Sequence, residues 1–438
     1  MQSYLAGFEA FTNDGGRDAP QWARSLRLSA ITRFEELGFP TTKNEDWHFT
    51  SVSPIAEREF EPLTGRRAEG GVAKRQLAPF GFGAADWHTL VFVNGRFDAS
   101  LSDVAGIPDG VSVLPLERAY DELPLLVEQH MGRIASIDAH TFTALNTAFI
   151  NDGAVVHVAK EVELTRPIHL LFVSDDGAVN GVAQPRNLIV LDRFAKATVI
   201  ETYAALDGTR GSYFTNAVTE ATLGDGSTLT HLKLQRESEQ AYHVGTVDVR
   251  QGRDSHLVSF SFATGGALSR TNVYTELRGE GCGATLNGLY LGDGEQHIDH
   301  QTRIEHFEPN CYSRELYKGI LDGSAHGVFN GKVFVHPAAQ KTDGKQTNNT
   351  LLLSEKAQID TKPQLEIFAD DVKCTHGATV GRLDDNSLFY MKSRGINART
   401  ARELLTYAFA ADVLETIELA EVKEGLEEIV LKRYTNYE

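Results

Sequence analysis

The chain has 438 residues, with 42 Lys plus Arg against 60 Asp plus Glu, so its formal net charge is −18. Because like charges repel, this balance argues against nucleic acid and anionic membrane surfaces as partners. Three Cys are too few for a disulfide framework and favour a reducing cytoplasm. The start of the chain has neither the basic segment nor the apolar run of a secretory signal, and no stretch is apolar enough to span a membrane.

The first segment is predicted to be helical. Apolar residues recur there at three- and four-residue spacing: Trp22, Leu26, Ala30, Ile31, Phe34 and Leu37. Gly38 and Pro40 predict the end of this helix. The polar stretch 56–76 is interpreted as a linker or long surface loop, and residues 115–150 as helical again. Between them, Asn94-Gly95 predicts a tight hairpin turn.

The middle of the chain, from about 154 to 375, shows short β-rich runs and no long helical periodicity. Small residues begin successive runs at Ala197, Ser227, Ser255 and Ala284, a period near 29. A repeat of this length is typical of a solenoid, and two or three strands per coil of a β-helix fit it best.

The last segment returns to helix. Asp384-Asp385 is expected to cap one helix, and Asn397 to cap a longer one. The apolar side of the longer helix consists of Ala401, Leu404, Leu405, Ala408, Val413 and Ile417. We therefore predict a mainly helical region 1–150, a β-helix core 151–382 and a helical region 383–438.

The cysteines offer two kinds of chemistry. Cys282 and Cys311 are one period apart, so they are expected to stack on adjacent coils, as buried small side chains or as a pair that could hold a soft metal. Cys374 and His376 are two residues apart, which places both on one face of a strand. Such a pair can act as nucleophile and base or supply two metal ligands.

Three further histidines, His297, His300 and His306, lie close together in sequence beside Asp299 and Glu305. A metal site is one interpretation. Because His297 and His300 fall on opposite faces of a strand, hydrogen bonding within the solenoid is favoured. No GxxxxGK[ST] motif occurs, so the chain is not expected to be a P-loop ATPase.

One long run, Gln340 to Ile396, resembles the SufB/SufD family of subunits of the bacterial Suf iron–sulfur cluster assembly machine. Shorter segments support the resemblance: KNEDWHFTSVSPI, LVFVNGRF, ALNTAF and SRELYKGIL. SufB typically has His-Glu-Ala where this chain has His376-Gly377-Ala378, and a Cys near Asn348. These departures place the chain nearer to SufD than to SufB.

The resemblance implies a right-handed parallel β-helix between helical N-terminal and C-terminal regions. It implies a complex with a SufB-like subunit and a SufC-like ATPase, in which the helical region 383–438 docks the ATPase through the apolar residues of its longer helix. A transient iron–sulfur cluster would form at the interface with SufB, with His376 and then Cys374 as site residues. No cluster is expected in the isolated chain, which could pair with a second copy of itself.

The function expected from this resemblance is that of a non-catalytic scaffold subunit in the cytoplasm. Two enzyme alternatives remain open. One is a thiol enzyme built on Cys374 and His376, and the other is a β-helix enzyme that acts on polysaccharides. A structural homodimer is a third alternative.

Overall fold

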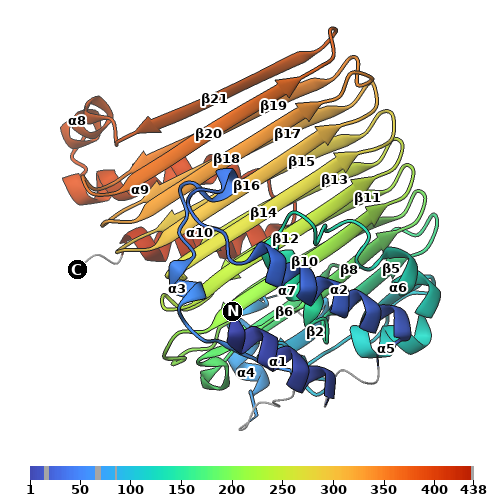
Figure 1. The fold of residues 1–438 in the computed structure, drawn as a ribbon. Helices are drawn as coiled ribbons and strands as arrows, with labels where there is room; N and C mark the ends of the chain where they lie inside the picture. The colour runs from blue at the N-terminus through green and yellow to red at the C-terminus, as the bar shows by residue number, and fades with distance from the viewer. Residues whose placement is uncertain (14–18, 65–70, 84–85, 436–438) are drawn as a thin grey trace.

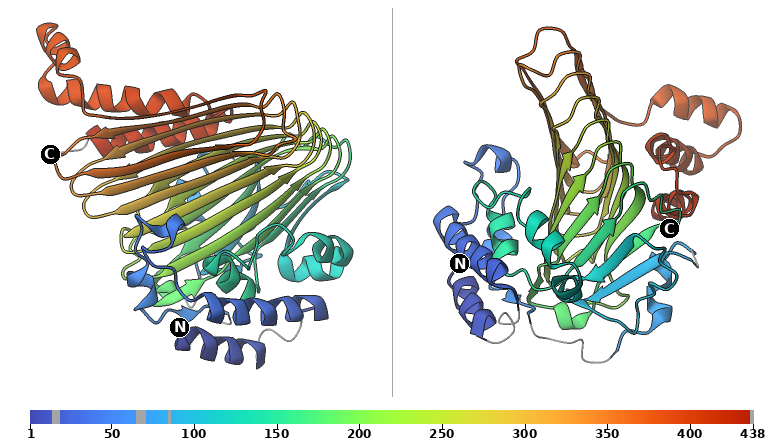
Figure 2. Two further views of the ribbon diagram at one scale, coloured as in Figure 1. Left: turned by 45° about the horizontal axis from the view of Figure 1, so that its top comes forward. Right: turned by 90° about the vertical axis from the view of Figure 1, so that its right-hand side faces the viewer.

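The computed structural model describes residues 1–13, 19–64, 71–83 and 86–435. A solenoid of parallel strands, two per coil, forms its centre, and helices from the two ends of the chain lie on opposite sides of the solenoid (Figures 1 and 2). This confirms the predicted β-helix with flanking helical segments. Within the described residues, no helix combines the length and apolar composition needed to cross a membrane.

The strands form two facing sheets, here called sheet A and sheet B, and successive strands along the solenoid alternate between them. Sheet A consists of β20 (Gln358–Ile367), β18 (His326–Val335), β16 (His297–His306), β14 (Leu268–Leu277), β12 (Tyr242–Gln251), β10 (Phe214–Leu223), β8 (Arg186–Leu191), β5 (Ala154–Val158) and β4 (Val111–Pro115), with the short β7 (Gly181–Ala183) and β1 (Glu61–Pro62) beside β10. Sheet B consists of β21 (Lys373–Gly381), β19 (Asp343–Leu352), β17 (Tyr312–Leu321), β15 (Gly283–Gly292), β13 (His256–Thr264), β11 (Thr228–Arg236), β9 (Lys196–Ala205), β6 (Ile168–Ser174), β2 (His88–Val93) and β3 (Arg96–Phe97).

The period near 29 is confirmed as one coil of two strands, but the predicted register was partly wrong. Thr228 pairs with Lys196, a step of 32 residues, and Gly283 pairs with His256, a step of 27. Ala197 therefore lies beside Leu229 rather than Ser227. Coil length varies because the corners between strands differ in length, and a fixed period cannot follow that variation.

The start of sheet B lies inside the region predicted to be helical. In β2 and β3 the antiparallel pairs Phe92–Phe97 and Val93–Arg96 confirm the hairpin at Asn94-Gly95, where both turn residues have positive φ. Strand β4 likewise pairs antiparallel with β5. The solenoid thus recruits strands from residues 1–150, and its first end finishes in short antiparallel strands.

Most of the N-terminal helices pack on the outer face of sheet A, whereas α4 (Lys74–Leu77) and η2 (Ala78–Phe80) pack against strands of sheet B. The longest N-terminal helix, α2 (Gln21–Leu37), ends at Gly38, whose φ is +65°, as the sequence predicts. The other helices of this region are α1 (Gln2–Asn13), η1 (Glu45–Trp47), α3 (Ser53–Ala56), α4 (Lys74–Leu77), η2 (Ala78–Phe80), α5 (Leu116–Glu122), α6 (Pro124–His130) and α7 (Thr141–Ala148), and the short η3 (Asp176–Ala178) lies within the solenoid. The linker predicted over 56–76 includes α4 and β1, and its residues 65–70 lie outside the described part of the chain.

A buried ion pair joins this region to the solenoid. The Arg186 guanidinium donates to Glu220 at 2.9 Å, and both side chains are fully buried. Arg186 also donates to Thr147 Oγ1 of α7, and Glu220 accepts the backbone N–H groups of Gly132 and Ala135. These hydrogen bonds replace the hydrogen bonds to water that the two charged groups lose on burial.

The C-terminal helices lie on the side of sheet B (Figure 2). They are α8 (Asp385–Ser393), α9 (Ala398–Leu414) and α10 (Ala420–Thr435). Asp384 and Asn397 accept backbone N–H groups at the starts of α8 and α9, which confirms both predicted caps. Apolar residues of α9 and α10 pack on outward-facing Leu, Phe and Ile side chains of sheet B in one core cluster.

Candidate functional site: the open end of the solenoid

The last coil of the solenoid consists of β20 and β21, which are the final strands of their sheets. In Figure 2 this coil rises beyond the helices packed on the two sheets. Successive backbone groups of a strand point to opposite sides. The Lys373 N–H donates to Thr342 O, so the even-numbered residues of β21 direct their amides to the free edge.

The two edges of this coil differ in their hydrogen-bonding capacity. The Gln358 N–H donates to Ala325 O, so the odd-numbered residues of β20 face the free edge. One of these is Pro363, which has no N–H to donate. Strand β21 contains no proline and therefore offers an uninterrupted row of donors at its free edge.

Both residues of the Cys-x-His motif lie on β21. Cys374 pairs with Gly344 and His376 with Gln346 of β19, so the two side chains share the face that points between the sheets, as predicted. Cys374 is partly buried against an apolar cluster that includes Val333, and burial raises the pKa of its thiol. His376 is exposed.

A polar column lies directly behind His376. Glu315, Gln346 and His376 are successive ladder partners on β17, β19 and β21. Gln346 Nε2 donates to Glu315 Oε2 at 2.7 Å, and both side chains are buried. Burial raises the pKa of Glu315 to about 7, so this carboxyl changes charge near neutral pH. The sequence analysis missed Glu315, because only the register of the coils connects it to His376.

Apolar side chains surround the open coil. Ile367, Phe368 and Val380 are each more than a third exposed. Exposed apolar groups next to an unpaired strand edge form a surface suited to another protein chain.

The other cysteines and histidines of the sequence analysis do not join this site. Cys282 and Cys311 are buried on adjacent coils, as predicted. The three histidines of β16 diverge: His300 stacks on Tyr290 inside the solenoid, His306 bonds Ser313 there, and His297 bonds Thr50 on the outer face. Within the described ranges, no group of three or more His, Cys, Asp or Glu side chains is placed to hold a metal ion. Cys374 and His376 are thus two potential ligands that the described residues do not complete to a metal site.

Comparison with known proteins agrees with this geometry. Residues 172–409 match the model of the SufBD core domain of the SUF system for FeS cluster assembly, and residues 1–170 match that of the SufBD protein N-terminal region. The chain belongs to the SufBD family.

Curated SufBD relatives match along nearly their whole length. The chain is 34% identical over 436 residues to the iron–sulfur cluster assembly protein SufD of Escherichia coli (strain K12), covering 99% of this chain and 95% of that protein. It is 30% identical to SufD of Bacillus subtilis (strain 168), covering 99% and 97%. It is also 34% identical to an iron–sulfur cluster assembly SufBD family protein of Synechocystis, covering 92% and 89%.

The residues predicted to dock an ATPase in this SufBD chain are divided between core and surface. Ala401, Val413 and Ile417 are buried within the chain itself, and Val413 and Ile417 belong to the cluster that packs α9 on sheet B. Leu405 is half-buried, whereas Leu404 and Ala408 are exposed. On α8, Phe389 and Tyr390 are 74% and 59% exposed. The surface open to a partner therefore lies on α8 and on the outward side of α9.

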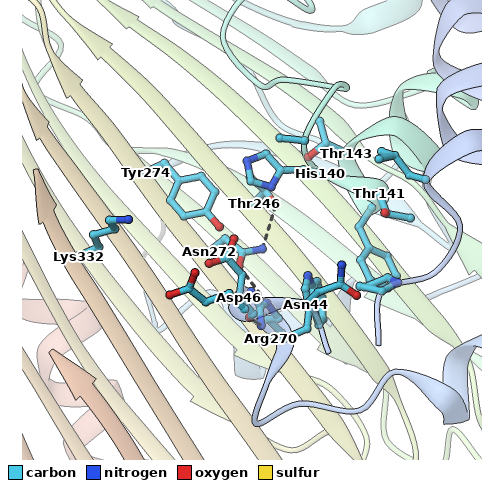
Figure 3. A pocket seen from close by; sticks show the side chains of 16 residues that line it. Asn44, Asp46, His140, Thr141, Thr143, Thr246, Arg270, Asn272, Tyr274 and Lys332 are labelled. Atoms are coloured by element: carbon cyan, nitrogen blue, oxygen red, sulfur yellow. Dashed lines mark hydrogen bonds between the residues drawn. The ribbon is translucent and has the colours of Figure 1, made fainter. Parts of the chain in front are cut away.

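A separate polar cavity of about 370 Å³ lies where the N-terminal region meets sheet A (Figure 3). Arg270 crosses its floor, stacked 3.7 Å from the centre of the Trp47 ring, and donates to Asp46 O and Asp299. His140 stacks on Tyr274, and burial lowers the pKa of this imidazole. These contacts hold residues 44–47 against the solenoid. The cavity lies on the outer face of sheet A and is therefore separate from Cys374 and His376, which belong to sheet B.

Proposed function

We propose that this chain is a non-catalytic scaffold subunit of a Suf-type iron–sulfur cluster assembly complex in the cytoplasm. It pairs with a SufB-like subunit and binds a SufC-like ATPase. The nascent cluster is cargo held at the interface between the two solenoid subunits, and the chain alone holds none. The observation that carries the proposal is the open last coil, which presents Cys374 and His376 beside an unpaired strand edge.

The chemistry of this coil supports a shared site. A cluster needs more ligands than the two that β21 supplies, so a partner must provide the others. Strand addition to β21 would place a partner strand next to Cys374 and His376, with main-chain hydrogen bonds supplying affinity. His376 is assigned as the interface ligand or proton-transfer group, and Cys374 as a second ligand or sulfur carrier.

Neither enzyme alternative is favoured by the geometry. A catalytic thiol needs a lowered pKa, whereas burial raises the pKa of Cys374. The family match gives no support to action on polysaccharides.

Proline substitution at the two free edges tests the pairing directly. Ala378→Pro removes one edge-facing N–H from β21 and leaves its ladder with β19 intact, as Pro363 does on β20. Thr361→Pro makes the same change at the free edge of β20 and serves as the matched control. Co-expressed with SufB-like and SufC-like subunits, A378P is expected to lose the SufB-like subunit in pull-downs while T361P retains it.

Circular dichroism of both variants establishes that they fold. A folded A378P chain that still retains the SufB-like subunit would contradict pairing through β21. Loss of partner in both variants would instead assign the pairing to both edges of the coil.

A further inference from the structure

A column of small polar side chains runs along one corner of the solenoid. Each member immediately precedes a strand of sheet B, and the corners succeed one another along the column: Ser227, Ser255, Cys282, Cys311 and Thr342. All five residues are buried. The column explains why Cys282 and Cys311 are one period apart.

The hydroxyl members donate to a backbone carbonyl three residues earlier. Ser255 Oγ donates to Gly252 O at 2.7 Å, and Thr342 Oγ1 donates to Ala339 O at 2.8 Å. Cys282 Sγ makes the same bond to Gly279 O at 3.0 Å. Serine and cysteine therefore fill one structural position, which supplies a conservative substitution for either thiol.

The two thiols contact the same oxygen atom. Cys311 Sγ donates to Gly279 O at 3.3 Å, the carbonyl that also accepts from Cys282 Sγ. The Tyr312 N–H donates to Cys282 O, so the two cysteines stand side by side across the ladder. Neighbouring strands are about 4.8 Å apart. A disulfide requires Cα atoms about 4.4–6.8 Å apart, and the usual spacing of neighbouring strands lies within that range.

We propose that Cys282 and Cys311 form a peroxide-sensitive dithiol, which oxidises to a disulfide joining two adjacent coils. The Cys282 thiolate attacks hydrogen peroxide, forming an S–O bond and breaking the O–O bond, and the released hydroxide becomes water by taking a proton. The Cys311 sulfur then attacks the sulfenic acid, forming the S–S bond and releasing a second water. In sum, two thiols and one peroxide give one disulfide and two waters.

The protonation of the pair matches these roles. A hydrogen bond with Cys311 lowers the pKa of Cys282 to about 7, and the same bond, followed by burial, raises the pKa of Cys311. One thiolate beside one thiol is the state that this oxidation requires. A soft metal ion held by both sulfurs would need two lasting thiolates beside the carbonyl oxygens of Gly252 and Gly279, which repel negative charge, whereas the oxidation needs one thiolate and only for its first step. The geometry therefore favours a neutral disulfide over a metal.

Mass spectrometry of the full chain tests this proposal. The protein is exposed to hydrogen peroxide, denatured, alkylated and digested, and the three cysteines are followed separately. We expect a peptide pair linked through Cys282 and Cys311, 2 Da lighter than the two free peptides, that disappears on reduction. The bond encloses residues 282–311, and the oxidised protein is expected to melt about 3 °C higher.

Serine variants assign the two steps. In C311S, Cys282 is expected to accumulate as a sulfenic acid that dimedone traps, and in C282S, Cys311 is expected to stay reduced. Ser255 and Thr342 show that this corner accommodates a buried hydroxyl. The partly exposed Cys374 is the internal control for peroxide exposure. Oxidation of Cys374 while Cys282 and Cys311 remain free thiols would overturn the proposal, as would equal trapping of Cys311 in C282S.

Discussion

His376 and Gln346 are ladder partners on the last two strands of sheet B, and Gln346 Nε2 donates a hydrogen bond to Glu315. The exposed imidazole at the open end therefore lies in one column with a buried carboxyl two coils deeper, and Gln346 lies between them. Burial raises the pKa of that carboxyl to about 7. The site thus combines a thiol and an imidazole at the open end with a buried carboxyl behind them that exchanges a proton near neutral pH.

Replacing the imidazole tests its role in holding cargo. His376→Ala is expected to lower cluster assembly at least tenfold in cells that depend on this pathway alone, because the interface loses a ligand. The readout is the iron and sulfide content of the purified complex. Thr375→Ala changes an exposed neighbour on the opposite face of β21 and should leave assembly unchanged. Normal assembly with H376A would contradict the assigned role.

Glu315 is expected to make stability depend on pH. Its raised pKa means that the native state keeps a proton that the unfolded chain loses above about pH 4.5. The free energy of unfolding therefore falls as pH rises towards 7, and stays lower above it. Glu315→Gln keeps an acceptor for Gln346 but cannot ionise.

Urea unfolding at pH 5 and pH 8 measures the effect. From pH 5 to pH 8, the free energy of unfolding of the wild type is expected to fall by roughly 1–3 kcal/mol more than that of E315Q. Glu355→Gln, at an exposed position, is the control, with a change below about 0.5 kcal/mol at either pH. If the free energies of unfolding of wild type and E315Q change with pH in parallel, burial does not raise the pKa of Glu315.

Breaking the buried ion pair Arg186–Glu220 is expected to lower the free energy of unfolding strongly. Arg186→Met leaves Glu220 as an uncompensated buried charge and is expected to cost about 3–5 kcal/mol of unfolding free energy. Arg118→Met removes an exposed partner of Glu122 and should cost less than about 1 kcal/mol. Chemical denaturation of both variants compares them, and equal losses would contradict the anchoring role of Arg186.

Exposed and buried residues of the C-terminal helices are expected to affect different properties, namely ATPase binding and the stability of the fold. Phe389→Ser combined with Leu404→Ser changes exposed groups and is expected to weaken ATPase binding at least tenfold with little change in melting temperature. Leu125→Ser, an exposed leucine on α6, is the control for loss of surface apolar area. Val413→Ala should instead destabilise the fold by about 2 kcal/mol, because Val413 packs on sheet B. Unaltered ATPase affinity of the double variant would place the docking surface elsewhere.

The fold was predictable where the pattern is local. The caps at Asp384 and Asn397, the Asn94-Gly95 hairpin and the end of α2 at Gly38 each depend on a few neighbouring residues. The repeat was predictable as an average, but corners of unequal length shifted the pairing of Ala197.

The candidate site was predictable only in part. A spacing of two residues fixes Cys374 and His376 on one face of any strand, so that prediction is confirmed. Glu315 lies 61 residues before His376, and only the coil register brings the two into one column. The apolar stripe predicted for the longer helix indicated a buried face, but not that the chain's own sheet B covers it. Val413 and Ile417 were therefore assigned to a partner, and Ile417 lies beyond the end of α9 at Leu414.

The two ends of the solenoid also differ in how they could join another solenoid end to end. At its first end, within the described residues, the sheets stop in the short antiparallel strands β3 and β4, whereas the last coil ends in the full-length edge of β21. If only the last coil of the described residues pairs with another solenoid, each molecule can join one neighbour end to end, because that contact covers the open coil of both. End-to-end growth then terminates at a pair and cannot continue into a fibre.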